Sequence, residues 1–385
     1  MARATIFAAV HLLTVLRFAC LPAAAERAEV SQAASRESHT DESDAAHLLQ
    51  TNVRTQTESR ISSSVSCPSY AALPKTNCYK DFWVDAMVDA DPLGGKVFMD
   101  VGCNTGVDAV NWLERWGAGN GLHGAWLAEL QSEGVDKGAC GENRESVLLA
   151  RKSQLQERKA VLAPGEMSRT NTTFTPDKKS RSFCIEAMPA NVKLLNKVSA
   201  AVLQDYSITS FTVINAAASN SSGTTSFPNY EEAPGAEDIG MNNNGTGHST
   251  RKLVDVKMVT VDELMEQHGL TSLDVLTIDT EGADPSVIQG ASKVLSGGHV
   301  RYLVFEVHQD LGGTAWSTTS LLSQIELLDG MNFDCYWATN DGHLSRLTGC
   351  WDELQEAKHH PVRWSNVACV NRGDEWHAVL ERYAS

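Results

Sequence analysis

Short apolar runs alternate along the chain with segments in which apolar residues recur at helical spacing. The short runs predict strands, and the periodic segments predict helices that cover them. Strands are expected at 97–101, 182–187, 211–217, 253–259, 275–278, 300–308, 333–338 and 366–371. Helices are expected at 81–88, 107–116, 144–162, 189–203, 260–264, 285–295, 316–328 and 374–382. This alternation predicts an α/β fold: a mostly parallel sheet of about seven strands with helices on both faces.

The first strand ends in a glycine-containing loop, DVGCNTG at 100–106. Gly102 and Gly106 permit a tight turn and the close approach of a bulky ligand. The spacing G-x-x-x-G matches neither the dinucleotide fingerprint nor the phosphate-binding P-loop. The carboxylate of Asp100 would repel a phosphate and suits a positively charged ligand, such as the sulfonium or amino group of S-adenosylmethionine. An aspartate at this place is equally typical of a strand-to-turn junction in any α/β protein.

Acidic residues and a histidine follow other predicted strands. Glu186 ends the second strand, where doubly wound nucleotide folds place an acid that binds the ribose hydroxyls. Asp279 and Glu281 follow the strand at 275–278, and Glu306 and His308 end the strand at 300–308. Because the carboxyl ends of parallel strands meet at one edge, we expect these groups to share a site that handles protons or a metal.

The N-terminus has the features of a secretory signal peptide. Residues 1–25 combine a basic start, an apolar run and a small-residue cleavage site. His11 and Arg17 interrupt the run and disfavour an uncleaved membrane anchor, which is kept as the alternative. Residues 26–66 are polar and are expected to be a disordered linker ahead of the domain at 67–385. We therefore expect a lumenal or secreted protein of the secretory pathway, membrane-anchored only if the segment is uncleaved.

Two segments interrupt the alternation of strands and helices. Residues 117–180 form a long insertion between the first two strands. Residues 219–250 are rich in Ser, Asn and Gly, and we expect a mobile loop or lid there because the stretch is too polar to pack. The chain's formal net charge of −16 argues against a nucleic-acid partner, since no basic field is available to neutralise phosphates.

The chain has nine cysteines, and one of them, Cys20, lies in the signal-like segment. The even remainder is compatible with disulfides in a secretory protein. Cys67 and Cys78 are the expected pair because they are close in sequence, and a second pair is expected from Cys335, Cys350 and Cys369. Cys103 and Cys184 are expected to be buried as small apolar residues. No group of Cys and His has zinc spacing.

With these elements in order, the chain resembles the FkbM family of S-adenosylmethionine-dependent methyltransferases from about residue 95 to residue 371. The matching stretches are VFMDVGCNTG (97–106), CIEAMPANVKLL (184–195), VINAAASNSSGTTSF (213–227), VKMVTVDEL (256–264), LDVLTIDTEGADPSVIQGA (273–291) and LVFEVHQ (303–309). IDTEGADPSVIQGA is the most specific of them. The resemblance implies a Rossmann-like, seven-stranded class I methyltransferase sheet and methyl transfer, usually to a hydroxyl oxygen.

The resemblance and the strand ends together predict residue roles. Cofactor contacts are expected at Asp100, Gly102, Asn104, Gly106 and Glu186. Asp279 or His308 is expected to be the general base, because imidazole titrates near neutral pH and burial raises a carboxylate toward it. Glu281 and Glu306 are expected to orient the acceptor. A divalent cation on Asp279, Glu281 and His308 is the less favoured alternative, so no metal is expected.

Three departures from the family pattern bear on function. Thr277 stands where the family commonly has lysine, the insertion at 117–180 is longer than usual, and a secretory location would require imported S-adenosylmethionine. The leading hypothesis is O-methylation of a sugar, glycan or lipid-linked hydroxyl. The alternatives are a cofactor-binding module without turnover and, disfavoured by the glycine spacing, a nicotinamide-dependent oxidoreductase.

Overall fold

The computed structural model describes residue 67 and residues 83–117, 121–135, 179–206, 210–236, 239–241, 252–308, 313–339, 343–356 and 364–384. These residues belong to one compact unit, Ser63–Ser385. The signal-like segment, the linker at 26–66 and the helix expected at 144–162 lie outside the described residues. No helix within the described ranges combines the length and apolarity that crossing a membrane requires.

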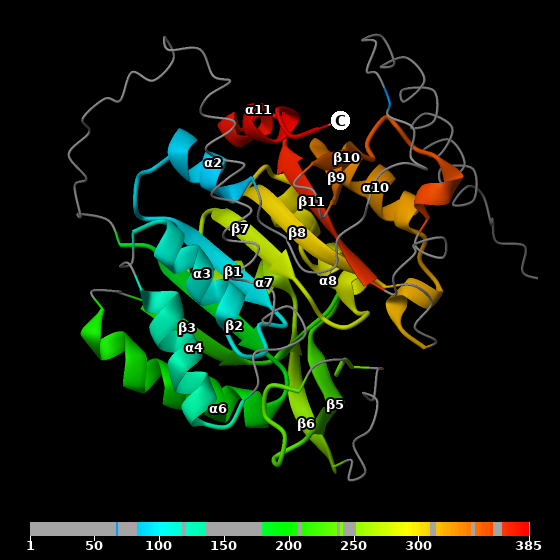
Figure 1. Cartoon of the computed structure of the whole chain (residues 1–385). Helices are drawn as coiled ribbons and strands as arrows, with labels where there is room; N and C mark the ends of the chain where they lie inside the picture. The colour runs from blue at the N-terminus through cyan, green and yellow to red at the C-terminus, as the bar shows by residue number, and fades with distance from the viewer. Residues whose placement is uncertain are drawn as a thin grey trace, which may run out of the picture. The chain divides into compact units, whose positions relative to one another are not determined.

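A central sheet of eight strands organises the unit (Figure 1). In spatial order the strands are β10 (Leu344–Arg346), β9 (Phe333–Ala338), β11 (Trp364–Asn371), β8 (Val300–His308), β7 (Leu273–Ile278), β1 (Val97–Val101), β2 (Arg181–Glu186) and β3 (Ser210–Asn215). The five strands from β8 to β3 are parallel, whereas β11 is antiparallel to both of its neighbours and β10 to β9. The expectation of about seven strands is wrong: the strand expected at 253–259 belongs to another sheet, and β10, which is too short to produce a pattern in the sequence, brings the central sheet to eight.

A second, three-stranded sheet holds one strand that the sequence analysis assigned to the central sheet. Its order is β4 (Ala217–Ala218), β6 (Lys252–Val259) and β5 (Gly223–Asn229), and Figure 1 shows β5 and β6 side by side. The expectation of a loop too polar to pack at 219–250 is wrong for β5, which pairs antiparallel with β6. Phe227 and Tyr230 are buried with Val256 in a small core of this sheet, and this burial outweighs the polar composition around them.

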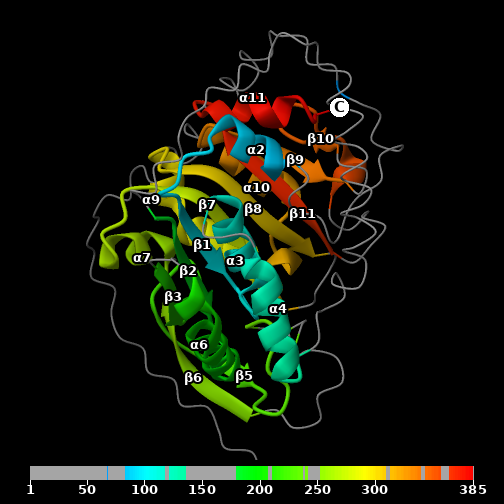
Figure 2. The same ribbon diagram turned by 60° about the vertical axis from the view of Figure 1, so that its left-hand side comes forward.

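Helices cover both faces of the central sheet, as expected (Figure 2). One face packs against α2 (Val84–Ala90), α3 (Val107–Arg115), α4 (Leu122–Ser132), α6 (Pro189–Val202) and α11 (Glu375–Glu381). The other packs against α7 (Val261–Gln267), α8 (Asp284–Gly290), α9 (Ser292–Ser296) and α10 (Leu321–Gly330). Short 3₁₀ turns are η2 (Leu203–Asp205), η3 (Ala315–Ser317) and η4 (Glu353–Gln355). Successive residues of a strand point to opposite faces of the sheet, so Phe98 packs on the first face and Met99 on the second.

Two of the expected helices are interrupted or begin late in the structure. The helix expected at 285–295 is divided into α8 and α9, which are separated by Ala291. A Cβ on Gly290 would meet the carbonyl oxygen of Ser219 at 2.0 Å, so this turn is packed directly against another backbone segment. The helix expected at 316–328 begins as η3 and continues as α10 only from Leu321. Within the insertion, α4 was not predicted.

The disulfides correct two sequence-based assignments. Cys67 is bonded to Cys350, so the expected Cys67–Cys78 pair is wrong; Cys78 itself lies outside the described residues. Cys103 and Cys184 are buried, as expected, but they form a disulfide with each other. The second expected pair is present as Cys335–Cys369. The wrong pairing arose because proximity in sequence says nothing about contacts between distant segments.

Candidate functional site

The glycine loop after β1 is held between two neighbouring strand ends. Gly102 has a φ of +81°, and a Cβ on it would meet the carbonyl oxygen of Asp279 at 1.7 Å. Its N–H donates to the carbonyl of Ile185 over 2.9 Å, as does that of Cys103 over 3.2 Å. Gly106 has a φ of +74° and is the N-cap residue of α3. These positions require glycine because of both the positive φ and the close packing.

Glu186 lies at the carboxyl end of β2 and is 5% exposed. Its Oε2 accepts a hydrogen bond from the N–H of Asn104 (2.8 Å), and its Oε1 accepts one from the N–H of Met188 (2.7 Å). Burial raises the pKa of Glu186 to about 7, although the hydrogen bonds from Met188 and Asn104 act in the opposite direction. The carboxyl group is thus fixed beside the glycine loop at the edge where ligands bind in this class of sheet.

A segment that follows β5 lies against this loop. Asn191 in α6 donates from Nδ2 to Oδ1 of Asn104 (3.1 Å) and accepts at Oδ1 from the N–H of Gly235 (2.7 Å). A Cβ on Gly235 would meet Val135 and Thr105 side-chain atoms at 2.7 and 2.9 Å. Asn191 therefore links the loop to a segment that is remote in sequence, and no periodic signal marked it for this role.

Two of the predicted acids, Asp279 and Glu281, lie in the turn between β7 and α8. The N–H of Asp279 donates to the carbonyl of Val101 (2.9 Å), which ties the turn to β1. Glu281 has a φ of +54°, in the left-handed region that few residues other than glycine adopt. Asp284, which is fully buried, accepts from the N–H groups of Thr280 (3.3 Å) and Gly282 (3.2 Å). Burial raises the pKa of Asp284 to about 6.

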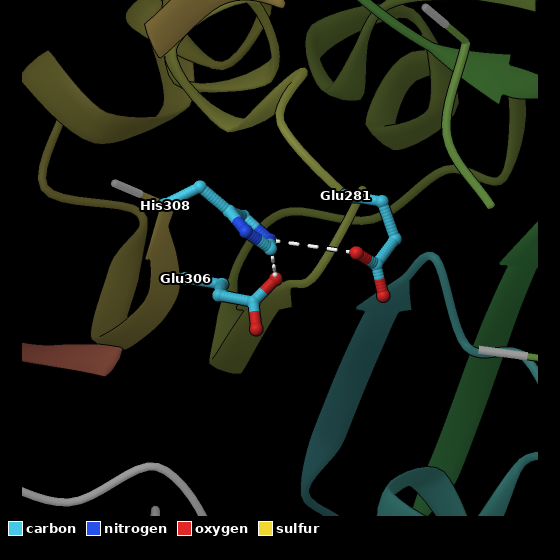
Figure 3. A group of neighbouring side chains, drawn as sticks. All are labelled: Glu281, Glu306 and His308. Carbon is cyan, nitrogen blue, oxygen red and sulfur yellow. Dashed lines mark hydrogen bonds and ion pairs between the residues drawn. The ribbon is translucent and has the colours of Figure 1, made fainter. Parts of the chain in front are cut away.

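Three side chains from this turn and from β8 form a compact group (Figure 3). His308 Nε2 lies 2.5 Å from Glu306 Oε2 and 3.4 Å from Glu281 Oε2. Both glutamates point toward the same edge of the imidazole ring. The side chains of His308 and Glu306 are 5% and 7% exposed, whereas that of Glu281 is 21% exposed and is the most open to solvent.

The predicted residues fall into two neighbouring groups along the edge of the sheet. Gly102, Asn104, Gly106 and Glu186 surround the loop between β1 and β2. Asp279, Glu281, Glu306 and His308 belong to the ends of β7 and β8. Asp100, which is 2% exposed, lies on β1 between them, in register with Cys184 on one side and Thr277 on the other. The structure thus brings the predicted residues to one edge of the sheet. The three residues close enough together to hold a metal ion are Glu281, Glu306 and His308, so Glu306 stands where the sequence analysis considered Asp279.

Residues 165–334 match the family model described as the methyltransferase FkbM domain. This part of the chain is similar to the domain of that methyltransferase family, and it is called the FkbM domain below. The matched range of the FkbM domain includes Glu186, Asp279, Glu281, Glu306 and His308. The glycine loop precedes it, so the resemblance seen from about residue 95 extends beyond the matched range. No curated protein and no solved structure matches the chain.

Sequence reasoning missed three polar residues of the FkbM domain and its flanks. Asp284 lies within the most specific stretch of the family resemblance, so its place in IDTEGAD was a signal that could have identified it. Asn191 and Asn366 carried no such signal. Asn366 is brought to the site by the pairing of β11 with β8, where it lies opposite Glu306.

Proposed function

We propose that the FkbM domain transfers a methyl group from S-adenosylmethionine to a hydroxyl oxygen of a sugar, glycan or lipid-linked acceptor. The observation that carries the proposal is the buried carboxyl group of Glu186, fixed against the backbone of the glycine loop at Asn104. In doubly wound folds an acid at this place receives hydrogen bonds from ribose hydroxyls. The family match favours methyl transfer over the hydride transfer of the oxidoreductase alternative.

The donor set around the loop fits such a cofactor. Asp100 supplies a buried carboxylate for a positively charged amino or sulfonium group. Thr277, its register partner on β7, has a buried Oγ1 that lacks a hydrogen-bond partner among the described residues. A buried polar atom of this kind carries a desolvation cost that a bound ligand removes. Asp100, Thr277 and Glu186 would therefore hold the cofactor from three adjacent strands.

The chemistry requires positioning and a proton acceptor. When bound, S-adenosylmethionine supplies an electrophilic methyl group, and its transfer to oxygen leaves the electron pair of the broken bond on sulfur. The domain has to hold the acceptor oxygen in line with that bond. Asp279 and His308 lie at neighbouring strand ends, where either can take the hydroxyl proton.

The acceptor class follows from the proposed compartment. The signal-like N-terminus and three disulfides in the described residues support a lumenal or secreted protein, because disulfides persist in oxidising compartments. Hydroxyl groups of glycans and lipid-linked sugars are abundant there. Membrane anchoring through residues 1–25 is the alternative to cleavage.

Calorimetric titration with S-adenosylhomocysteine tests the cofactor site. We expect a Kd of about 1 μM for the full chain. Asp100→Ala and Glu186→Ala should each weaken binding about 10- to 100-fold, because a hydrogen bond to a charged group contributes about 1.5 to 3 kcal/mol. Asp255→Ala, on the exposed face of β6, serves as the matched control and should bind like the wild type.

Turnover separates an enzyme from a binding module. With labelled S-adenosylmethionine and a panel of glycan acceptors, Asp279→Asn should keep cofactor affinity while losing about 10²- to 10⁴-fold in transfer rate. A folded wild type that does not bind S-adenosylhomocysteine contradicts the methyltransferase proposal. Binding without transfer to any hydroxyl acceptor contradicts the proposed reaction and favours the module.

A further inference from the structure

Glu281, Glu306 and His308 bring three potential ligand atoms within 4.8 Å of one another. Two carboxylates face one imidazole edge, as Figure 3 shows, and Glu306 and His308 are almost completely buried. Separations of about 3 Å between ligand atoms are those found around an octahedral cation with bonds of about 2.1 Å. This geometry alone is also that of a histidine hydrogen-bonded to a carboxylate.

Asn366 provides the second, independent observation. It is 1% exposed, and neither Oδ1 nor Nδ2 has a hydrogen-bond partner among the described residues. In the antiparallel pairing of β11 with β8 it stands directly opposite Glu306. Directly opposed residues project from the same face of a sheet with Cβ atoms about 5 Å apart, so the Asn366 side chain lies beside that of Glu306 on the face that carries the group. A buried amide whose two polar atoms both lack hydrogen-bond partners requires an explanation. A site for a ligand that contacts the amide is one such explanation.

We propose that Glu281, Glu306, His308 and Asn366 form a binding site for a divalent cation. Two carboxylates and an amide oxygen are the ligands preferred by Mn²⁺ and Mg²⁺, and the added imidazole favours the transition metal Mn²⁺ over Mg²⁺. The cation satisfies Asn366 Oδ1 and neutralises the two glutamates, of which Glu306 is buried. This ligand set differs from the set considered from sequence, in which Asp279 took the place that Glu306 and Asn366 occupy here.

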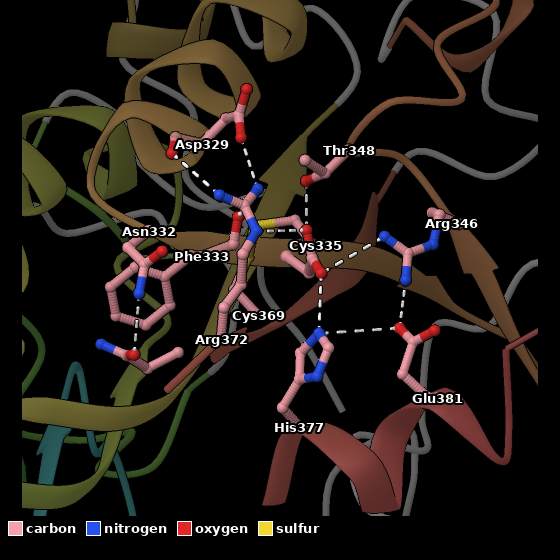
Figure 4. A network of polar contacts seen from close by, with 12 residues as sticks. Asp329, Asn332, Phe333, Cys335, Arg346, Thr348, Cys369, Arg372, His377 and Glu381 are labelled. Atoms are coloured by element: carbon pink, nitrogen blue, oxygen red, sulfur yellow. Dashed lines mark hydrogen bonds and ion pairs between the residues drawn. A yellow bond between two sulfur atoms is a disulfide. The ribbon is translucent and has the colours of Figure 1, made fainter. Parts of the chain in front are cut away.

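A second group of acids and a histidine in the described residues is paired with arginine side chains. Asp334, His377 and Glu381 also lie within 4.8 Å of one another. Arg372 Nε bonds Asp334 Oδ1 (2.8 Å), Arg346 lies 3.3 Å from Asp334 Oδ2, and Arg346 also pairs with Glu381 (Figure 4). Guanidinium groups thus supply the positive charge, and this group is a matched control.

The proposed function left open whether Asp279 or His308 takes the hydroxyl proton, and the cation site decides between them. This assignment rests on the proposed function. A cation at the end of β8 binds the acceptor hydroxyl and lowers its pKa. His308 Nε2 is then a ligand, and Asp279 is the group that takes the proton. Cation binding itself does not depend on methyl transfer and is measured separately.

The test is titration of the chelator-treated full chain with MnCl₂, with free Mn²⁺ followed by electron paramagnetic resonance. We expect one site, weakened about 10- to 100-fold in Glu306→Gln and His308→Gln and about tenfold in Asn366→Leu. Asn366→Asp should bind Mn²⁺ more tightly than the wild type, because it adds a charged ligand in the same place. His377→Gln should leave binding unchanged.

Two results overturn the proposal. One is a wild type that binds S-adenosylhomocysteine but not Mn²⁺. The other is Mn²⁺ binding that persists in Glu306→Gln and Asn366→Leu or is lost in His377→Gln. Thermal unfolding of each variant identifies any that fail to fold, and Asn366→Asp tests the site through a gain of affinity. Since the S-adenosylhomocysteine titration is run without metal, failure of the proposed function is seen independently.

Discussion

At Glu186, a single carboxyl group carries a stability cost and, in the proposed function, binds the cofactor ribose. Burial raises its pKa from 4.5 to about 7, so the folded state holds the proton more tightly than the unfolded chain does. Stability linked to this proton is fully present below pH 4.5 and is lost as the pH rises through about 7. Ribose hydroxyls that donate to the carboxylate would reduce this cost in the bound state.

We predict that the wild type loses unfolding free energy relative to Glu186→Gln as the pH rises from about 4.5 to about 7, by an amount on the order of 3 kcal/mol. The glutamine variant has no proton to lose at this position, so the comparison isolates Glu186. Urea unfolding of both proteins at several pH values measures the difference. Parallel pH profiles would show that Glu186 has an ordinary pKa.

Among single residues, the acids at strand ends could be predicted because each follows directly on its own apolar strand. Glu186, Asp279 and Glu306 needed no knowledge of the pairing partners. Asn366 could not be predicted, since it acquires its proposed role only when β11, the last strand along the chain, pairs antiparallel with β8. An amide in a buried strand has the same local pattern whether or not it lies beside a site.

At the scale of elements, α7 shows a helix whose start is encoded locally. The Oγ1 of Thr260 accepts from the N–H of Glu263 (3.1 Å), and the Glu263 carboxylate accepts from the N–H of Thr260 (3.2 Å). This reciprocal capping box satisfies two backbone donors at the helix start. Asp262 in the same turn accepts from the N–H groups of Lys293 and Val294 and so joins α7 to α9.

Replacing the capping hydroxyl should destabilise the domain modestly. We predict that Thr260→Ala lowers the free energy of unfolding by about 1 kcal/mol, because one backbone N–H loses its acceptor. Thr260→Ser keeps the hydroxyl and is expected to stay close to the wild type. Urea unfolding measures both variants, and equal midpoints for alanine and threonine would argue against the cap.

Other elements were altered by contacts that are distant in sequence. The apolar pattern at 285–295 is continuous, yet the helix is interrupted where Gly290 packs against the backbone of Ser219. The strand at 211–217 is likewise divided between two sheets, with β3 in one and β4 in the other. Helical and strand periodicity predict the type of element, but not where another segment interrupts it.

For the whole molecule, the Cys67–Cys350 disulfide joins positions that are 283 residues apart. In the chain-entropy account, a crosslink stabilises the fold by restricting the unfolded chain, more so for a longer loop. Cys335–Cys369, with a separation of 34 residues, joins two adjacent strands that are already paired. The first bond therefore constrains the chain far more than the second.

We predict that Cys67→Ser lowers the free energy of unfolding by about 2 to 5 kcal/mol. Peptide mapping under non-reducing conditions should recover Cys67 linked to Cys350. A peptide that links Cys67 to Cys78 would instead support local pairing and contradict the structure.

The amino-acid sequence alone determined the alternation of strands and helices, the glycine loop and the acids at strand ends, because periodicity, φ preference and capping act over a few residues. It also carried the family resemblance. Tertiary structure decided that β6 leaves the central sheet, that Cys67 pairs with Cys350 and that Asn366 faces Glu306. These outcomes depend on which distant segments bury their apolar faces together, and no local pattern encodes that choice.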